Sequence, residues 1–131
     1  MSGDKTPVFT CFIFKKLFMN VQSLRENGRE EPIDGVTLAQ LAAGERMSVQ
    51  HFEIKPGARV DDHSHEHEQA GFLIDGSLRL TVGDEIYHLT PGDSYVIPGG
   101  AVHAAYGEGD EAAIGVELFS PPRLNLPWDE S

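Results

Sequence analysis

The amino-acid sequence predicts an all-β fold, a sandwich or barrel built from short strands. Turn signals made of Gly, Pro, Asn and Asp recur about every eight to twelve residues, which is typical of that class. Apolar and polar residues alternate between these turns, and no long pattern with a helical period competes with them. The 131 residues suffice for one domain with its own hydrophobic core.

The first part of the chain predicts few regular elements. Residues 19–34 are polar and predict a strand or loop that enters the barrel, and residues 35–41 predict a short strand or a turn of helix. Residues 47–54 predict the first clear strand, because their apolar side chains are distributed over both faces of an extended segment. Pro56-Gly57 then marks a turn.

The rest of the chain predicts a series of strands separated by glycine-containing turns. Residues 77–82 alternate most clearly; Asp75-Gly76 before them predicts a hairpin, and Gly83-Asp84 after them predicts another turn. The further strands are expected at residues 70–74, 86–89, 94–97, 102–106 and 112–119.

A double proline, Pro121-Pro122, ends the last expected strand, because proline cannot donate to the ladder of a sheet. We therefore expect a single domain with three parts along the chain. These are an N-terminal extension with the segment that enters the barrel (1–34), the barrel itself (35–123) and a C-terminal tail (124–131).

The charge of the chain is strongly negative. Its 21 acidic and 10 basic residues give a net charge of −11, which argues against nucleic acid or an anionic membrane as a partner and predicts a cytoplasmic protein. The apolar residues 8–18 are too few to span a bilayer, contain Lys15 and Lys16, and precede no signal-peptide cleavage site. Either the protein starts at Met19, or these residues cover a barrel edge or a dimer face.

Residue types that bind metals gather after the first strong turn. Residues two apart on an extended strand point to the same face, so His63, His65, His67 and Gln69 can lie on one side. A second stretch reaches His103 after a Pro-Gly-Gly turn. Imidazole nitrogens together with amide or carboxylate oxygens suit borderline divalent metals, so the sequence predicts a metal site.

The two stretches resemble the two sequence motifs of the cupin superfamily. Gln69 stands where the first motif usually has Glu, and Gly107 stands where the second usually ends in Asn. The resemblance implies a single-domain double-stranded β-helix, or jelly-roll barrel, that binds one divalent ion (Zn, Ni, Mn, Fe or Co). The ligands it implies are His63, His65, Gln69 and His103. The other matching positions are Gly57, Gly76, Gly92, Pro98 and Gly100.

Gln69 changes the charge expected at such a site. A neutral amide in place of a carboxylate leaves a divalent site about one charge more positive, which favours an anionic substrate and argues against oxygenase chemistry. Glu68 is the alternative ligand, through a bulge, although the spacing of the motif fits Gln69. His67 stays open as a ligand, while His51 and His88 are expected outside the site.

The wider pattern is similar to that of the pectin-degradation cupins of KdgF type. Besides the histidines it includes a Pro-Gly-Asp-Ser-Tyr stretch and an acid-x-Phe-x-Pro-Pro-Arg tail. The resemblance implies an enzyme that converts unsaturated uronates from pectin or alginate to linear ketonic forms. Glu117, where Asp is expected, and Arg123 are its implied catalytic residues, with Phe119 at the substrate. Tyr95 and Tyr106 either supply phenols to the cavity or pack the barrel, and we assign Tyr95 to substrate binding.

Other functions share these motifs. Another metal-dependent cupin enzyme, such as a dioxygenase or a cyclase, is one alternative, and a non-catalytic module that binds a small molecule is another. In the uronate hypothesis the ligand is a small sugar acid whose carboxylate pairs with Arg123, because a guanidinium suits bidentate carboxylate recognition. Small cupins commonly pair, so we also expect a homodimer.

Overall fold

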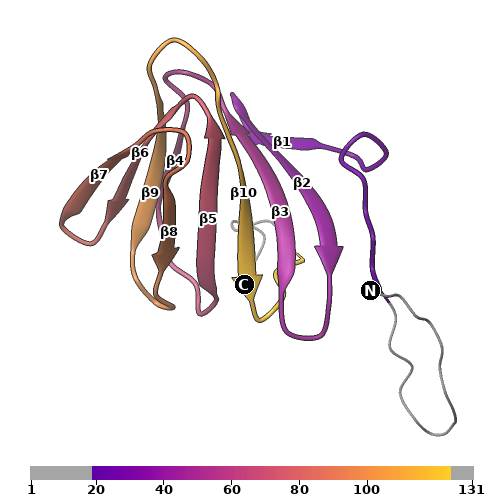
Figure 1. Ribbon diagram of the computed structural model, residues 1–131. Helices are drawn as coiled ribbons and strands as arrows, with labels where there is room; N and C mark the ends of the chain where they lie inside the picture. Colours follow the sequence, from indigo (N-terminus) through magenta and orange to yellow (C-terminus); the bar gives the residue numbers. More distant parts are fainter. Residues whose placement is uncertain (1–18, 125–131) are drawn as a thin grey trace, which may run out of the picture.

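The computed structural model describes residues 19–124, and within them the chain forms β-strands and no helix (Figure 1). The described residues thus contain no helix long and apolar enough to cross a membrane. The alternatives for residues 8–18 lie outside the described part, as do residues 125–131. The strands are β1 (Glu30–Ile33), β2 (Val36–Ala43), β3 (Ser48–Ile54), β4 (Arg59–His63), β5 (Glu68–Asp75), β6 (Ser77–Val82), β7 (Glu85–Leu89), β8 (Ser94–Ile97), β9 (His103–Glu108) and β10 (Ala113–Ser120).

The strands form two antiparallel sheets that enclose one interior (Figure 1). One sheet has the order β1-β2-β3-β10-β5-β8, and the other has the order β4-β9-β6-β7. Strands far apart in the sequence, such as β3 and β10, are therefore neighbours. This is the all-β jelly-roll barrel that the sequence predicts.

The turn at Asp75-Gly76 is not the hairpin that its sequence predicts. β5 belongs to the six-stranded sheet and β6 to the four-stranded sheet, so the chain crosses between sheets here. Gly76 has a φ of +79°, and a Cβ at this position would overlap the carbonyl group of Ala112. Only a glycine therefore fits the crossing. The predicted turn at residues 83–84 does join a hairpin, because β6 pairs directly with β7.

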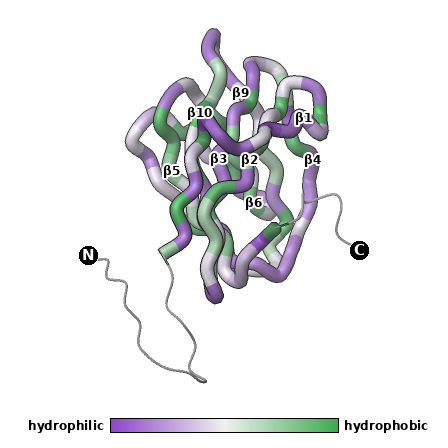
Figure 2. The backbone as a smooth tube through the Cα atoms, turned by 90° about the vertical axis from the view of Figure 1, so that its right-hand side faces the viewer, coloured by the Kyte–Doolittle hydropathy of each residue, from purple (hydrophilic) through white to green (hydrophobic). Residues whose placement is uncertain are grey.

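β4 is not among the strands that we predict from the sequence. Its only apolar residue is Val60, and the tube through this strand is mostly hydrophilic in Figure 2. β4 is an edge strand of its sheet and pairs only with β9. The alternation that reveals a half-buried strand is consequently missing. The segment predicted as a short strand or turn of helix at residues 35–41 is the strand β2.

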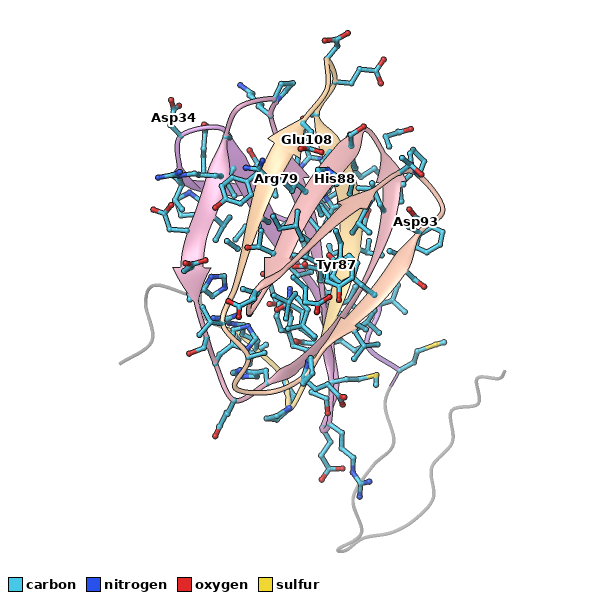
Figure 3. The ribbon with its side chains drawn as sticks, turned by 90° about the vertical axis from the view of Figure 1, so that its left-hand side faces the viewer. Asp34, Arg79, Tyr87, His88, Asp93 and Glu108 are labelled. Atoms are coloured by element: carbon cyan, nitrogen blue, oxygen red, sulfur yellow. The ribbon has the colours of Figure 1, made fainter. Side chains whose placement is uncertain are left out.

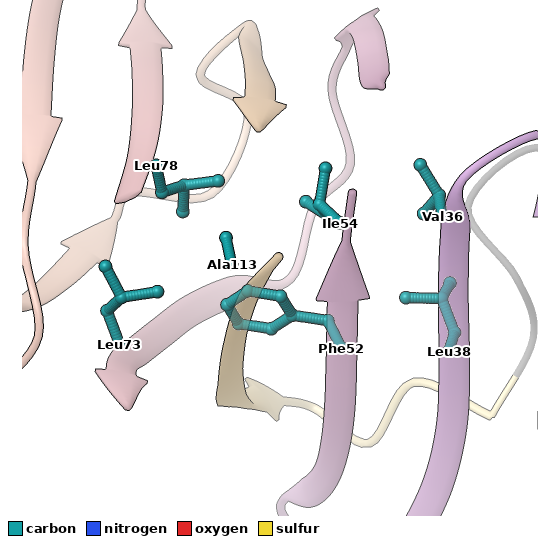
Figure 4. Close-up of a cluster of buried hydrophobic side chains, with 7 residues drawn as sticks. All are labelled: Val36, Leu38, Phe52, Ile54, Leu73, Leu78 and Ala113. Atoms are coloured by element: carbon teal, nitrogen blue, oxygen red, sulfur yellow. The ribbon is translucent and has the colours of Figure 1, made fainter. Parts of the chain in front are cut away.

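The core contains side chains from both sheets (Figure 4). Burying such aliphatic and aromatic groups contributes about 1.5 to 3 kcal/mol each. The cluster comprises Val36, Leu38, Phe52, Ile54, Leu73, Leu78 and Ala113.

The inward side chains of the six-stranded sheet form rows that run across its strands, because residues in register lie side by side. Two neighbouring rows carry polar side chains, and they define the polar end of the barrel. The first contains Ser48, Phe119, Gln69 and Ile97, and the second contains Gln50, Glu117, Gly71 and Tyr95. The next row, with Leu38, Phe52, Gly115 and Leu73, is apolar and begins the apolar end. The register therefore separates the core from a group of polar side chains.

Candidate metal centre and its cavity

Three histidines meet at the polar end of the barrel, as the sequence predicts. His63 ends β4 and pairs in register with His103, which begins β9, while His65 follows in the next loop. Their rings lie close together, with centroids 4.2 Å apart for His63 and His103 and 4.9 Å apart for His65 and His103. One ring nitrogen from each histidine lies within 4.8 Å of the others. Three imidazole nitrogens gathered in this way are a donor set that could hold one divalent ion.

The backbone fixes which nitrogen each histidine presents. In all three rings Nδ1 lies 2.9–3.1 Å from the carbonyl oxygen of a residue two positions away. A carbonyl oxygen only accepts, so in His63 and His103 Nδ1–H donates to the backbone and Nε2 keeps its lone pair toward the cluster. This is the arrangement that orients histidine ligands in metal sites. In His65, Nε2 also faces an acceptor, Oε1 of Gln69, at 3.0 Å. The carbonyls belong to Asp61, His67 and Ala101 for His63, His65 and His103 respectively.

The electrostatics of the cluster also fit a divalent ion. Nε2 of His103 is buried without a hydrogen-bond partner among the described residues. Burial lowers the pKa of His103 to about 4 and also lowers the pKa of His65. Both imidazoles are consequently neutral at pH 7, which is the protonation state that binds a metal. The orphaned nitrogen and the neutral rings together make this a fitting donor set.

Gln69, rather than Glu68, faces the histidines. Gln69 is buried on the inner face of β5, and its Oε1 lies 3.0 Å from Nε2 of His65. Glu68 is exposed, because neighbouring residues of a strand point to opposite faces. His67 lies outside the cluster, with its ring 5.4 Å from that of His65. The role of Gln69 as a ligand stays a prediction that this geometry favours.

Glu117 lies beside Gln69 in the cavity and accepts several hydrogen bonds. Its Oε2 accepts from Nε2 of Gln69 at 2.7 Å and from the hydroxyl of Tyr95 at 2.8 Å. Among the described residues, its Oε1 accepts one long bond, 3.4 Å, from Nε2 of Gln50. Burial raises the pKa of Glu117, while these donors and the charge of Arg123 act in the opposite direction. The bond from Gln69 also orients its amide, so that Oε1 faces the histidines.

Tyr95 reaches Glu117 across a glycine. Gly71 pairs with Glu117 on one side and with Tyr95 on the other. A Cβ at position 71 would overlap the phenol ring, so the absence of a side chain creates the space that Tyr95 fills. Burial and the nearby Glu117 raise the pKa of Tyr95 well above its usual value, so the phenol remains protonated and donates. Tyr95 does line the cavity, and its hydroxyl is directed at Glu117.

Arg123 is buried at the same end of the barrel and is not a solvated arginine at a strand exit. Only 3% of it is exposed, and its Cζ lies 5.2 Å from the ring centroid of Phe119. Phe119 is equally buried and presents its ring to His65 at a centroid distance of 5.9 Å. Burial raises the pKa of Glu117 and the charge of Arg123 partly offsets this, while the same charge adds to the lowering of the pKa of His103 by burial. The positive charge of the guanidinium therefore favours the ionised form of Glu117 and the neutral form of His103.

One cavity connects these groups. Its volume is about 50 Å³, which leaves room for a small ligand or several waters. At one end it is lined by His63, Gln69, Tyr95, His103, Glu117 and Arg123. At the other end apolar core side chains, among them Phe52 and Ile54, line it.

Two site residues are missing from the sequence-based predictions. Ser48 and Gln50 point inward from β3, where Gln50 contacts Glu117 and Ser48 bonds to the backbone of Arg123. The available signal is the alternation in β3, because it places these two polar residues on the face that carries Phe52. Polar residues at buried strand positions usually have a specific partner.

The remaining histidines and Tyr106 lie on outer faces. Tyr106 stacks under Arg79, with the guanidinium carbon 4.2 Å from the ring centroid, so it contributes no phenol to the cavity. Nδ1 of His88 is hydrogen-bonded to Oε1 of Glu108 at 3.1 Å, beside Arg79 on the four-stranded sheet (Figure 3). His51 is half-buried on the outward side of β3. None of them belongs to the histidine cluster.

Solved structures with similar folds include two small proteins. KdgF from Halomonas sp. superimposes with a TM-score of 0.75 at 24% identity, covering 81% of this chain and 96% of that one. An RmlC-like cupin from Shewanella frigidimarina NCIMB 400 gives a TM-score of 0.72 at 24% identity, covering 79% of this chain and 92% of that one. At these identities the likeness shows the fold alone.

Curated relatives match over part of their length. H2HPP isomerase of Bacillus subtilis is 32% identical over 66 residues, which are 50% of this chain and 28% of that protein. Oxalate decarboxylase OxdC of Bacillus subtilis (strain 168) is 32% identical over 74 residues, which are 53% of this chain and 19% of that protein. The chain thus spans less than a third of the length of these relatives. The family described as the cupin domain matches residues 50–119, more than half of the chain. Together with the jelly-roll sheets and the histidine cluster, this match shows that the chain belongs to the cupin domain family.

Proposed function

We propose that this cupin is an enzyme that opens the ring of unsaturated uronates to give linear keto acids. The observation that carries the proposal is the placement of a buried arginine, Arg123, and a buried carboxylate, Glu117, in one cavity with the histidine cluster. A cationic clamp, a proton carrier and a metal-binding set are the groups that such an isomerisation uses. The resemblance of the tail to the KdgF type supports the same substrate class.

Arg123 binds the uronate carboxylate in this proposal. Its burial over the ring of Phe119 removes water from the guanidinium, which strengthens a bidentate pair with a carboxylate. The chain carries a net charge of −11, so the protein as a whole repels an anion. The local positive charge of Arg123 reverses that repulsion inside the cavity.

Glu117 moves the proton. In the ring opening, the hydroxyl proton at C1 leaves, the bond from C1 to the ring oxygen breaks, and an aldehyde forms at C1. The enol left at C5 becomes a ketone when C4 gains a proton, so the net reaction is an isomerisation. Oε1 of Glu117 is the oxygen that takes and returns the proton, because Oε2 is already bonded to Gln69 and Tyr95.

A divalent ion would be held by His63, His65, His103 and Gln69, and when bound it would supply Lewis acidity to oxygens of the substrate. With four neutral ligands the ion would keep its full charge, which suits an anionic substrate. The protein groups around the ion bind and orient the substrate, and they exclude water. The apolar end of the cavity contributes to that exclusion.

The test is an assay of the purified, metal-analysed protein with a 4,5-unsaturated monouronate. We expect the absorbance of the conjugated double bond to disappear and a linear keto acid to form at equal rates with and without oxygen. Oxygen consumption would instead favour the dioxygenase alternative. Tight binding of the uronate without turnover would favour the non-catalytic module.

Replacing Arg123 with alanine is expected to raise KM for the uronate about 10- to 100-fold, because a charge-assisted bond to a carboxylate contributes about 1.5 to 3 kcal/mol. The change in kcat should be much smaller, since a carboxylate clamp acts in both the ground state and the transition state. Steady-state kinetics measure both constants. Arg59→Ala is the matched control, because Arg59 is exposed outside the cavity and pairs with Asp61. A KM in Arg123→Ala equal to that of the control would remove the clamp from the proposal.

We also propose that the chain forms a homodimer through the outer face of β5 and β8. Phe72, Ile74 and Val96 are 44%, 45% and 62% exposed there. β8 is an edge strand, and Val96 pairs across to Ala70 within an uncharged row. Two copies can lay these apolar side chains against each other and keep their acidic residues in water.

Light scattering at micromolar concentration should therefore give twice the mass of the chain. The double change Phe72→Glu with Val96→Glu should give the monomer mass, since it would place charges in the apolar contact. Ile86→Glu, at an exposed position on β7, is the control and should remain dimeric. A monomeric wild type would contradict the pairing.

A further inference from the structure

The segment that follows the last strand, β10, returns to the start of β3 and contacts it. Phe119 of β10 pairs with Ser48 at the start of β3, and the next residues lead back to the same serine. The backbone N–H of Arg123 donates to Oγ of Ser48 at 2.8 Å, and that hydroxyl donates in turn to the carbonyl oxygen of Arg123 at 3.3 Å. Ser48 is 1% exposed, so no water replaces either bond. One hydroxyl thus holds both backbone polar groups of Arg123.

This contact fixes the backbone from which the side chain of Arg123 extends. Fixing the backbone N–H and carbonyl of a residue fixes the direction of its Cα–Cβ bond. From that anchor the side chain of Arg123 extends over Phe119, at 5.2 Å from its ring centroid, and lines the cavity. The residue that sets this geometry is 75 positions away in the sequence. Without it, the last residues before the tail have a freer path and the side chain has more orientations.

We propose that Ser48 is a positioning residue that holds Arg123 in the orientation needed to bind the carboxylate of the substrate. The inference rests on the proposed function in taking an anion as the substrate. Ser48 does not line the cavity and does not touch the reacting groups. It acts through Arg123, by keeping the clamp assembled before the substrate arrives.

A second serine provides a matched control in the same segment. Oγ of Ser120 donates to the carbonyl oxygen of Arg46 at 2.7 Å, so it ties the same loop to the residues just before β3. Ser120 is exposed and makes no contact with Arg123 in this bond. Removing either hydroxyl loosens the loop closure, but only the change at Ser48 frees the backbone of Arg123.

The first experiment compares the kinetics of Ser48→Ala and Ser120→Ala with those of the wild type on the unsaturated uronate. We expect Ser48→Ala to raise KM about 10-fold, since two hydrogen bonds of ordinary strength are lost, and to change kcat less than about 2-fold. Metal content should be unchanged. Ser120→Ala should keep both constants near the wild-type values. If the two variants show the same KM, the positioning role is wrong.

The second experiment needs no substrate and therefore separates this inference from the proposed function. In the wild type, the Nε–H signal of Arg123 in a nitrogen-edited NMR spectrum should be sharp and exchange slowly with water. In Ser48→Ala its exchange should be at least about 10-fold faster, and in Ser120→Ala it should not change. If the wild type does not convert the uronate, the proposed function fails while this comparison still decides the role of Ser48. Equal exchange in all three proteins would overturn the inference.

Ser48→Cys provides a second variant if the alanine protein is too unstable to study. The thiol keeps nearly the volume of the hydroxyl and makes weaker hydrogen bonds. Its KM and its Arg123 exchange rate should lie between those of the wild type and those expected for alanine. Wild-type values of both in Ser48→Cys would count against the inference.

Discussion

The double variant His63→Ala with His65→Ala should contain no divalent metal after purification at neutral pH. Two of the three imidazoles that converge within 4.8 Å would be gone, leaving His103 and an amide oxygen as the remaining donors. A single histidine and an amide bind borderline divalent ions weakly compared with a set of three or four ligands. Elemental analysis of the two purified proteins measures the difference. Activity on the uronate should disappear with the metal.

The control for this result is the double variant His51→Ala with His88→Ala. It removes the same number of imidazoles from outside the cluster, where His51 is half-buried and His88 pairs with Glu108. Its metal content should equal that of the wild type. Equal metal in all three proteins would show that the ion, if bound, is held somewhere else.

Glu117→Gln should lower kcat about 10²- to 10⁴-fold, which is the usual contribution of a positioned proton carrier. The amide has the shape of the carboxylate and cannot take up a proton at neutral pH. Its oxygen can still accept from Gln69 and Tyr95 in the place of Oε2, so Gln69 keeps its orientation. KM and metal content should consequently change little. Steady-state kinetics and elemental analysis of the same preparation test both statements.

Two outcomes would contradict this role. A kcat close to that of the wild type would show that Glu117 carries no proton in the slow step. Loss of the metal in Glu117→Gln would show that the carboxylate acts mainly by orienting Gln69, through the 2.7 Å bond between them. Tyr95→Phe is a useful comparison, because it removes one donor to Oε2 and leaves the carboxylate in place.

The sequence predicts the strands well where alternation is strong. β6 and β8 have the predicted bounds, and both carry apolar residues on their inward face. β4 is not predicted, because four of its five residues are polar or charged. The turn at Gly76 shows a further limit, since a turn signal reveals where the chain bends but not which sheet the next strand joins.

The site likewise has features that the sequence predicts and features that it does not. The clustering of His63, His65 and His103 is predicted because their spacing matches the two cupin sequence motifs. The contact of Gln50 with Glu117 spans 67 positions and exists only because β3 pairs with β10 in one register. Local sequence carries no information on that register. The requirement for Gly71 is equally hidden, since it arises from the ring of a tyrosine on the neighbouring strand.

The separation of polar and apolar rows on the six-stranded sheet has a consequence for how this barrel can change over evolutionary time. The row that contains Gln50 and Glu117 lies beside the row that contains Phe52, and the row of Ile54 comes next along the same two strands. Substitutions in the polar rows change the lining of the cavity, while the apolar rows continue to keep the sheets together. The chemistry of the cavity can therefore change through a few exchanges at one end of the barrel, without a change in the side chains of the core.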